Sequence, residues 1–274
     1  MDILELERVS KRIRLQVFEQ AIKAGIGHLG GTFSCIDLLV GLYYGGTFKI
    51  DPENPHSVEQ DRFILSKGHA CLALYSILLE KGFISRETFM TFGRDGGLGA
   101  QLDVSTPGVD WNTGSLGHSI GITAGISLAS RLNGNSNYAY SMIGDAELSE
   151  GSAWEAIAFA GDQNLSNLVV IIDRNKLSVT EVLEDDAIYY NLGSKIESFG
   201  WKFIEIDGHS HGEIADSLSS IRNSTKPTML LANTIKGKGV SFMEHQIRWH
   251  HAMPTPEEIV LARNELADSE VDGT

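Results

Sequence analysis

The sequence predicts an α/β fold built on a doubly wound, mostly parallel sheet. Short apolar runs that are typical of buried strands alternate along the chain with longer segments whose apolar residues recur at helical spacing. Two of these runs, 138–143 and 168–172, are separated by a single helical segment at 149–163. Strands joined in this way are usually parallel neighbours, connected by a right-handed crossover.

The individual elements are predicted from periodicity, turn residues and caps. Residues 2–24 carry apolar side chains at helical spacing, and this helix should end at Gly25. A loop is expected at 27–31, and Ser34 with Asp37 should form a capping box for the next helix. Further helices are expected at 35–44, 69–79, 85–92 and 119–131, and two more should begin near residue 211 and at Thr255-Pro256. Further strands are expected at 62–66, 202–206 and 228–233. Irregular loops are expected at 51–61, 93–112 and 234–253.

Length and composition indicate one globular domain. Of 274 residues, 1–267 are expected to form a single domain, and 268–274 an acidic tail. A net charge of -14 argues against a nucleic-acid or membrane-surface partner. Two cysteines without metal-ligand spacing, and no signal-peptide or membrane-span pattern, favour a cytoplasmic protein.

Polar residues at two strand ends predict a metal-bridged diphosphate site. Asp145 follows the first strand of the central pair, and Asn175 follows the second. Their oxygens should meet at one edge of the sheet, and the carbonyl of Leu177 could be a third ligand. Hard oxygen ligands of this kind suit Mg²⁺ shared with phosphates.

This motif, GDAELSEG followed by WEA and DRNKLSV, resembles the thiamine diphosphate motif of transketolase. The resemblance implies a thiamine diphosphate-binding (PP-type) fold and two cofactors, thiamine diphosphate and Mg²⁺. It assigns the metal to Asp145, Asn175 and Leu177. It also assigns cofactor contacts to Gly144, Asp145, Ala146, Asn175 and Val179. Ala146 stands where the family usually has glycine.

Further stretches resemble transketolase from Gly27 to Pro254. SKGHA implies that His69 contacts the diphosphate, and TGSLG implies that Gly114, Ser115 and Leu116 lie along the aminopyrimidine. GHLGG and the late Trp249-His250 loop imply catalytic roles for His28 and His250, with His250 also on the cofactor. Because His251 stands where the family often has glycine, either His250 or His251 could be the active-site residue.

Several other polar residues receive less specific interpretations. Glu150 and Glu155 match transketolase glutamates near the contact between subunits, and we interpret them as catalytic proton-relay residues; surface carboxylates are the alternative. Lys236 and Lys238 could steer a phosphate, but as loop lysines they are expected to be exposed and solvated. His118, His209, His211 and His245 are interpreted as structural or surface residues.

The resemblance implies transfer of a two-carbon ketol unit from a ketose-type donor to an aldehyde acceptor. The pyrimidine-binding domain of transketolase is missing, which implies that the partner is a separate C-terminal subunit, in an α2β2 assembly, and that the chain is inactive alone. The family's substrate histidine falls on Ala100 or Gln101, so the donor could be an α-keto acid or a modified ketose. The alternative is a decarboxylating α-hydroxyketone synthase, similar to deoxyxylulose phosphate synthase or a keto-acid dehydrogenase decarboxylase.

Overall fold

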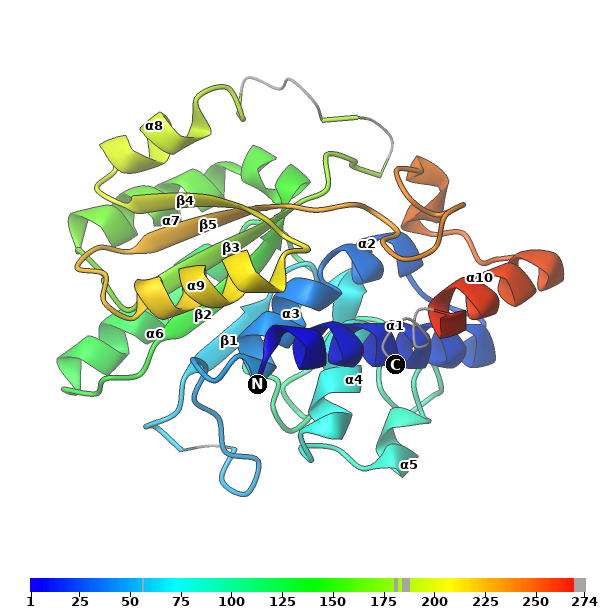
Figure 1. Ribbon diagram of the computed structural model, residues 1–274. Helices are drawn as coiled ribbons and strands as arrows, with labels where there is room; N and C mark the ends of the chain where they lie inside the picture. The colour runs from blue at the N-terminus through cyan, green and yellow to red at the C-terminus, as the bar shows by residue number, and fades with distance from the viewer. Residues whose placement is uncertain (56, 180–181, 184–187, 269–274) are drawn as a thin grey trace.

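The structure is a computed structural model that describes residues 1–55, 57–179, 182–183 and 188–268. Its centre is a five-stranded, fully parallel sheet in the order β1-β2-β3-β5-β4 (Figure 1). The strands are β1 Arg62–Leu65, β2 Ala139–Gly144, β3 Leu168–Arg174, β4 Lys202–Asp207 and β5 Thr228–Asn233. The predicted doubly wound α/β fold is confirmed.

Helices cover both faces of the sheet. They are α1 Ile3–Ala24, α2 Leu29–Ser34, α3 Ile36–Tyr44, α4 Cys71–Glu80, α5 Arg86–Phe89, α6 Ser119–Leu132, α7 Gly151–Asp162, α8 Leu192–Ser198, α9 His211–Ile221 and α10 Pro256–Asp268. Three short 3-10 helices are η1 Gly68–Ala70, η2 Asp145–Ser149 and η3 Ile247–His250. Helix α8 lies in a region for which the sequence predicted no helix. None of the described helices is both long and apolar enough to span a bilayer.

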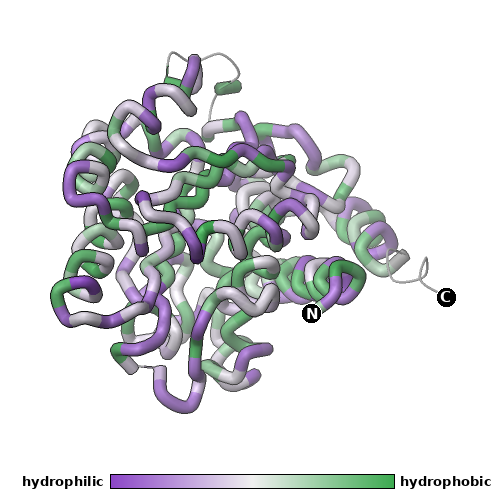
Figure 2. The backbone as a smooth tube through the Cα atoms, turned by 60° about the vertical axis from the view of Figure 1, so that its left-hand side comes forward, coloured by the Kyte–Doolittle hydropathy of each residue, from purple (hydrophilic) through white to green (hydrophobic). Residues whose placement is uncertain are grey.

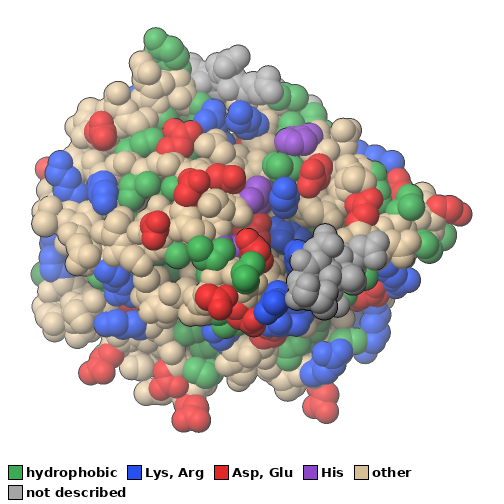
Figure 3. Space-filling view, in the orientation of Figure 1, with side chains coloured by type: hydrophobic (Ala, Val, Ile, Leu, Met, Phe, Trp, Pro, Cys, Tyr) green, Lys and Arg blue, Asp and Glu red, His purple; other side chains and the backbone are tan. Residues whose placement is uncertain are grey.

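Alternation along the buried strands separates two hydrophobic cores. In β3, Val169 and Ile171 pack with α1, α3, α4 and α9, whereas Val170 and Ile172 pack with α6, α7 and α8. Both sets are almost fully buried, which makes the strands continuous apolar runs in the sequence. Figure 2 shows these hydrophobic stretches in the interior, with polar segments outside. Acidic and basic side chains are interspersed on the face shown in Figure 3.

The segment after α1 differs from the prediction. Instead of a loop at 27–31, helix α2 begins at Leu29 and contains Gly30 and Gly31. A Cβ at Gly30 would lie 2.7 Å from the carbonyl oxygen of Trp249, and one at Gly31 would lie 3.0 Å from Nε2 of His69. Glycine is therefore required here by close packing, and tertiary contacts override its low helix propensity.

The predicted capping box at Ser34 is also wrong. The hydroxyl of Ser34 donates to Asp173 at 2.6 Å and lies 3.0 Å from the carbonyl oxygen of Gly31, while Asp37 accepts hydrogen bonds from Arg14. By contrast, the cap predicted for the last helix is present. Thr255 Oγ1 accepts the amide of Glu258 at 3.3 Å, and the Glu258 carboxylate accepts the amide of Thr255 at 2.8 Å. Of the expected tail 268–274, residues 269–274 lie outside the described residues.

Candidate functional site

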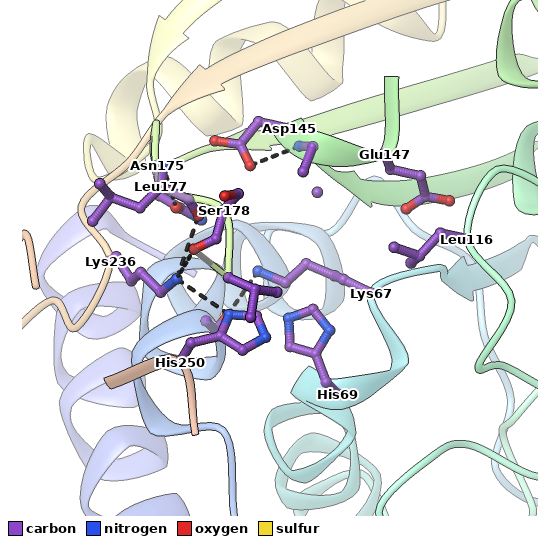
Figure 4. Close-up of a pocket in the computed structure, with 14 residues that line it drawn as sticks. Lys67, His69, Leu116, Asp145, Glu147, Asn175, Leu177, Ser178, Lys236 and His250 are labelled. Atoms are coloured by element: carbon purple, nitrogen blue, oxygen red, sulfur yellow. Dashed lines mark hydrogen bonds between the residues drawn. The ribbon is translucent and has the colours of Figure 1, made fainter. Parts of the chain in front are cut away.

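A cavity of about 120 Å³ opens at the carboxyl edge of the sheet, where β1, β2, β3 and β5 end (Figure 4). This is the edge at which open parallel sheets bind ligands. Its lining comes from segments far apart in the sequence: Gly31, Lys67, His69, Leu116, Gly144, Asp145, Ala146, Glu147, Asn175, Leu177, Ser178, Val179, Lys236 and His250. Most of the predicted cofactor residues therefore share one cavity.

Asp145 lies beside the segment that follows β3, as the parallel pairing of β2 with β3 requires. Gly144 pairs with Asp173, so Asp145 leaves β2 beside the end of β3. Its Oδ2 accepts the amide of Lys176 at 2.6 Å, and its Oδ1 accepts the amide of Ala146 at 2.9 Å. Lys176 has a left-handed backbone with φ of 63°, a costly conformation for a non-glycine residue that directs this amide to the carboxylate.

The chemistry of this edge fits a cation. Burial, with a smaller effect from Asp173, raises the pKa of Asp145 to about 6, and its side chain accepts only backbone amides in the hydrogen bonds of the described chain. A buried carboxylate without a cationic partner is costly, so a bound metal ion would stabilise it. Among the described residues, no group of three or more His, Cys, Asp or Glu side chains could hold a metal. Any metal at this edge would need the amide and carbonyl oxygens of Asn175 and Leu177.

A buried ion pair that the sequence did not predict lies beneath the cavity. The Lys67 ammonium pairs with the Asp173 carboxylate, and their side chains are 2% and 0% exposed. Ser34 and Thr234 also donate to this carboxylate. Burial alone would raise the pKa of Asp173, but the charge of Lys67 and these hydrogen bonds outweigh it and hold the pKa below its ordinary value.

Lys236 is not solvated, contrary to the prediction. It is only 1% exposed, and its Nζ donates to the carbonyls of Leu177 at 3.3 Å and Ser178 at 3.0 Å. Burial and the nearby charge of Lys67 lower its pKa to about 8. Lys238, two residues later, is partly exposed and lies 3.9 Å from Glu244. The cavity therefore has an ammonium group beside the predicted metal ligands.

Four imidazole rings lie at the mouth of the cavity. The ring centroid of His28 is 5.4 Å from that of His69, 5.6 Å from that of His250 and 4.7 Å from that of His251. Of the two candidates in the late loop, His250 lines the cavity and its Nδ1 lies 3.2 Å from Nζ of Lys236, whereas His251 is exposed.

Three of these imidazoles, those of His28, His69 and His250, have lowered pKa values, which favours their neutral form. Burial, followed by the charge of Lys236, lowers the pKa of His250 to about 4. Burial likewise lowers the pKa of His69 well below its ordinary value, with Lys67 as the next cause, and the pKa of His28, with His251 as the next cause. A neutral imidazole adds no charge to the site and has one nitrogen that can accept and one that can donate a hydrogen bond.

Five of the predicted residues do not line this cavity. His28 contacts its histidines from the mouth, and Ser115 lines a neighbouring cavity of about 340 Å³. Gly114 has φ of 126°, which only glycine adopts readily. Glu150 and Glu155 are outside the cavity, with Glu150 exposed and preceding α7. Their assigned roles stay predictions.

Glu147 is a lining residue that the sequence analysis missed. It is buried, and its Oε1 accepts the amide of Gly117 at 2.9 Å and the hydroxyl of Ser66. It thereby joins the segment before α6 to the ends of β1 and β2. No signal in the sequence distinguishes Glu147 from a solvated glutamate near a helix start, because its burial depends on the packing of three distant segments.

Comparison with known proteins identifies the family. Residues 6–270 match the family described as "Transketolase, thiamine diphosphate binding domain". The chain is 38% identical to an apulose-4-phosphate transketolase subunit of Phocaeicola vulgatus, over 98% of this chain and 96% of that protein. It is also 38% identical to a 6-deoxy-6-sulfo-D-fructose transketolase subunit of Clostridium sp., over 93% of each chain.

A solved structure agrees with the sequence relatives. The transketolase of Campylobacter jejuni superposes with a TM-score of 0.91 at 29% identity, covering 97% of this chain and 43% of that chain. The chain thus spans less than half of that transketolase. These similarities support a transketolase-type reaction over the decarboxylating alternative. The chain belongs to the transketolase family of transferases, and it is a subunit that contains the family's thiamine diphosphate-binding domain.

Proposed function

We propose that this chain is the diphosphate-binding subunit of a two-chain transketolase, which transfers a two-carbon ketol unit from a ketose to an aldehyde. The observation that carries the proposal is the cavity that Asp145, Asn175 and Leu177 line together at adjacent strand ends. Two relatives named as transketolase subunits, matched nearly end to end, support it.

The residues present fit thiamine diphosphate with Mg²⁺. Asp145, Asn175 and the Leu177 carbonyl are the proposed metal ligands, and Lys236 and His69 are the proposed cationic and imidazole contacts of the diphosphate. When bound, the cofactor supplies a nucleophilic carbon that accepts the ketol unit. The backbone amide of Ala146 donates to the Asp145 carboxylate. The methyl group of Ala146, where the family usually has glycine, does not prevent this hydrogen bond.

The neutral imidazoles suit proton handling beside the substrate. Because the Lys236 ammonium donates to Nδ1 of His250, the ring proton lies on Nε2, which can donate to a substrate oxygen. We propose the same class of role for His28, whose ring lies between those of His69 and His251. The low pKa of His250 keeps its imidazole uncharged over the physiological range.

We also propose that the donor differs from an ordinary sugar phosphate. Gln101, rather than Ala100, brings a polar side chain to the turn before His69. Its Oε1 accepts the hydroxyl of Thr113 at 3.2 Å and lies 2.1 Å from the position that a Cβ on Gly68 would occupy. We propose that the amide of Gln101 replaces the family's imidazole at this position. The relatives named for apulose 4-phosphate and 6-deoxy-6-sulfo-D-fructose support a modified ketose.

The partner is proposed to be a C-terminal transketolase subunit that carries the pyrimidine-binding domain, in an α2β2 assembly. The naming of the relatives by subunits, rather than by whole enzymes, supports a second chain. The buried, unpaired thiols of Cys35 and Cys71 support the cytoplasm as the compartment.

Reconstitution tests the proposed function. This chain and a candidate partner, assayed together with thiamine diphosphate, Mg²⁺ and a panel of ketoses and α-keto acids, are expected to transfer a ketol unit without releasing carbon dioxide. Each chain alone is expected to show no turnover, because the cofactor lies between the two domains. Turnover by this chain alone, or carbon dioxide release by the pair, would contradict the proposal.

A Glu155→Gln substitution tests the proton relay. We expect exchange of the C2 proton of the cofactor in the assembled enzyme to slow by about 100-fold, because the substitution removes a proton-transferring carboxyl group. The matched control is Glu197→Gln on α8, an exposed glutamate away from the cavity. Equal exchange rates in the two variants would show that Glu155 is an ordinary surface carboxylate.

A further inference from the structure

A hydrogen-bonded chain of side chains connects α1 and α3 with the segment that carries Lys236. Its centre is Asp37 on α3, which is 4% exposed. Arg14 on α1 contacts both carboxylate oxygens, with Nη1 3.0 Å from Oδ1 and Nη2 2.5 Å from Oδ2. The same carboxylate meets Nδ1 of His209, 2.6 Å away, in the loop between β4 and α9. The sequence analysis interpreted His209 only as a structural or surface residue.

The proton position on His209 follows from its other contact. The backbone amide of Ile235, which can only donate, lies 2.8 Å from Nε2 of His209. Nε2 is therefore the acceptor, and the ring proton lies on Nδ1, where it is donated to Asp37. A carboxylate that fixes the tautomer and orientation of a histidine in this way is a common arrangement behind functional sites.

Ile235 is the residue before Lys236, in a segment that is otherwise held by backbone contacts. The amide of Thr234 donates to the carbonyl of Arg174 at 3.0 Å, and the amide of Gly237 donates to the carbonyl of Gly30 at 2.9 Å. The amide of Ile235 instead donates to the side chain of His209. The position of the main chain just before Lys236 thus depends on the side chain of His209, which a substitution can remove.

A precise main-chain position matters for Lys236 because its ammonium group is buried. Its Nζ must reach the carbonyls of Leu177 and Ser178 at once, in a cavity that also contains the charge of Lys67. A flexible lysine side chain loses much rotamer freedom on burial, and a displaced main chain would leave its charge without these partners.

We propose that Asp37 and His209 are positioning residues that hold Lys236 in the cavity through the amide of Ile235. Asp37 orients the imidazole, and the imidazole receives the amide. This inference rests on the proposed function, in which Lys236 contacts the diphosphate.

Two substitutions at one position separate the two hydrogen bonds of the ring. In His209→Gln the carboxamide reaches roughly the place of Nε2 and can accept the amide of Ile235. In His209→Asn the carboxamide reaches roughly the place of Nδ1 and can donate to Asp37, but it leaves Ile235 without a partner. The matched control is His211→Asn, because His211 also contacts Asp37, at 3.5 Å, and has no hydrogen bond to Ile235.

The measurement is calorimetric binding of magnesium pyrophosphate to the full-length chain, with amide hydrogen exchange at Ile235 as a second readout. We expect His209→Asn to weaken binding by about 10-fold and to speed exchange at Ile235, as substitutions behind a binding site commonly do. The affinities of His209→Gln and His211→Asn for magnesium pyrophosphate are expected to lie within about threefold of that of the unmodified chain, because both variants keep an acceptor for the amide of Ile235. A general loss of folding would instead affect both asparagine variants.

Lys236→Met, measured in parallel, distinguishes a failure of the proposed function from a failure of the positioning role. No uptake of magnesium pyrophosphate by the unmodified chain would overturn the proposed function and this inference together. If Lys236→Met weakened binding while His209→Asn bound as well as His209→Gln, the proposed function would stand and the positioning role would be wrong.

Discussion

Replacing Asp145 by asparagine is expected to abolish cofactor binding while leaving the chain folded. The variant keeps the size of the side chain and one oxygen, which can accept the amide of either Ala146 or Lys176, but it removes the charge that a metal ion would neutralise. Calorimetry with Mg²⁺ and thiamine diphosphate should detect no uptake by the reconstituted pair, and ketol transfer should fall by at least about 1,000-fold.

The stability measurement distinguishes this result from misfolding. Without metal, the buried carboxylate of Asp145 is costly, as its pKa of about 6 indicates. The asparagine variant removes this charge but leaves one of the two backbone amides without an acceptor. Because these two effects oppose each other, its unfolding temperature should stay close to that of the unmodified chain. Asp216→Asn, at an exposed position on α9, is the matched control and should change neither property. Normal cofactor uptake by the Asp145 variant would refute the proposed metal site.

Removing the cation beneath the cavity should have the largest effect on stability. In Lys67→Met the carboxylate of Asp173 stays fully buried without its partner, and the hydroxyls of Ser34 and Thr234 cannot compensate for the lost charge. Breaking a buried ion pair on one side typically costs about 3–5 kcal/mol of the free energy of unfolding. Urea denaturation of the unmodified chain and the variant measures this difference.

The double variant Lys67→Met with Asp173→Asn should be more stable than Lys67→Met alone, because no unpaired charge remains. Lys226→Met, at an exposed position, should change the free energy of unfolding by less than about 0.5 kcal/mol. If Lys67→Met cost no more than this control, the ion pair would contribute nothing to the fold.

The sheet and the metal edge could be predicted from the sequence because both depend on local patterns. Apolar runs predict the strands, the helix between them predicts parallel pairing, and pairing brings Asp145 beside the end of β3. The residues that share the cavity with Asp145 and follow strand ends, such as His69 and Asn175, are accessible to the same reasoning. These features require no knowledge of how distant loops pack.

What could not be predicted depends on contacts between segments far apart in the chain. The burial of Lys236 requires the loop after β5 to pack against α2 and against the end of β3. A lysine followed by glycine in a polar loop is usually solvated, and no local pattern indicates otherwise. The short helix containing Gly30 and Gly31 was missed for a similar reason, since its glycines are required by Trp249 and His69.

The order of the strands has a consequence for synthesis of the protein. The cavity needs His69 after β1, Asp145 after β2, Asn175 after β3 and Lys236 after β5, and it also needs His250 near the end of the chain. A nascent chain still attached to the ribosome therefore has no complete cofactor site until His250 has emerged. By mass action, the coenzyme can stabilise only chains in which this segment has been synthesised and cannot assist earlier folding intermediates.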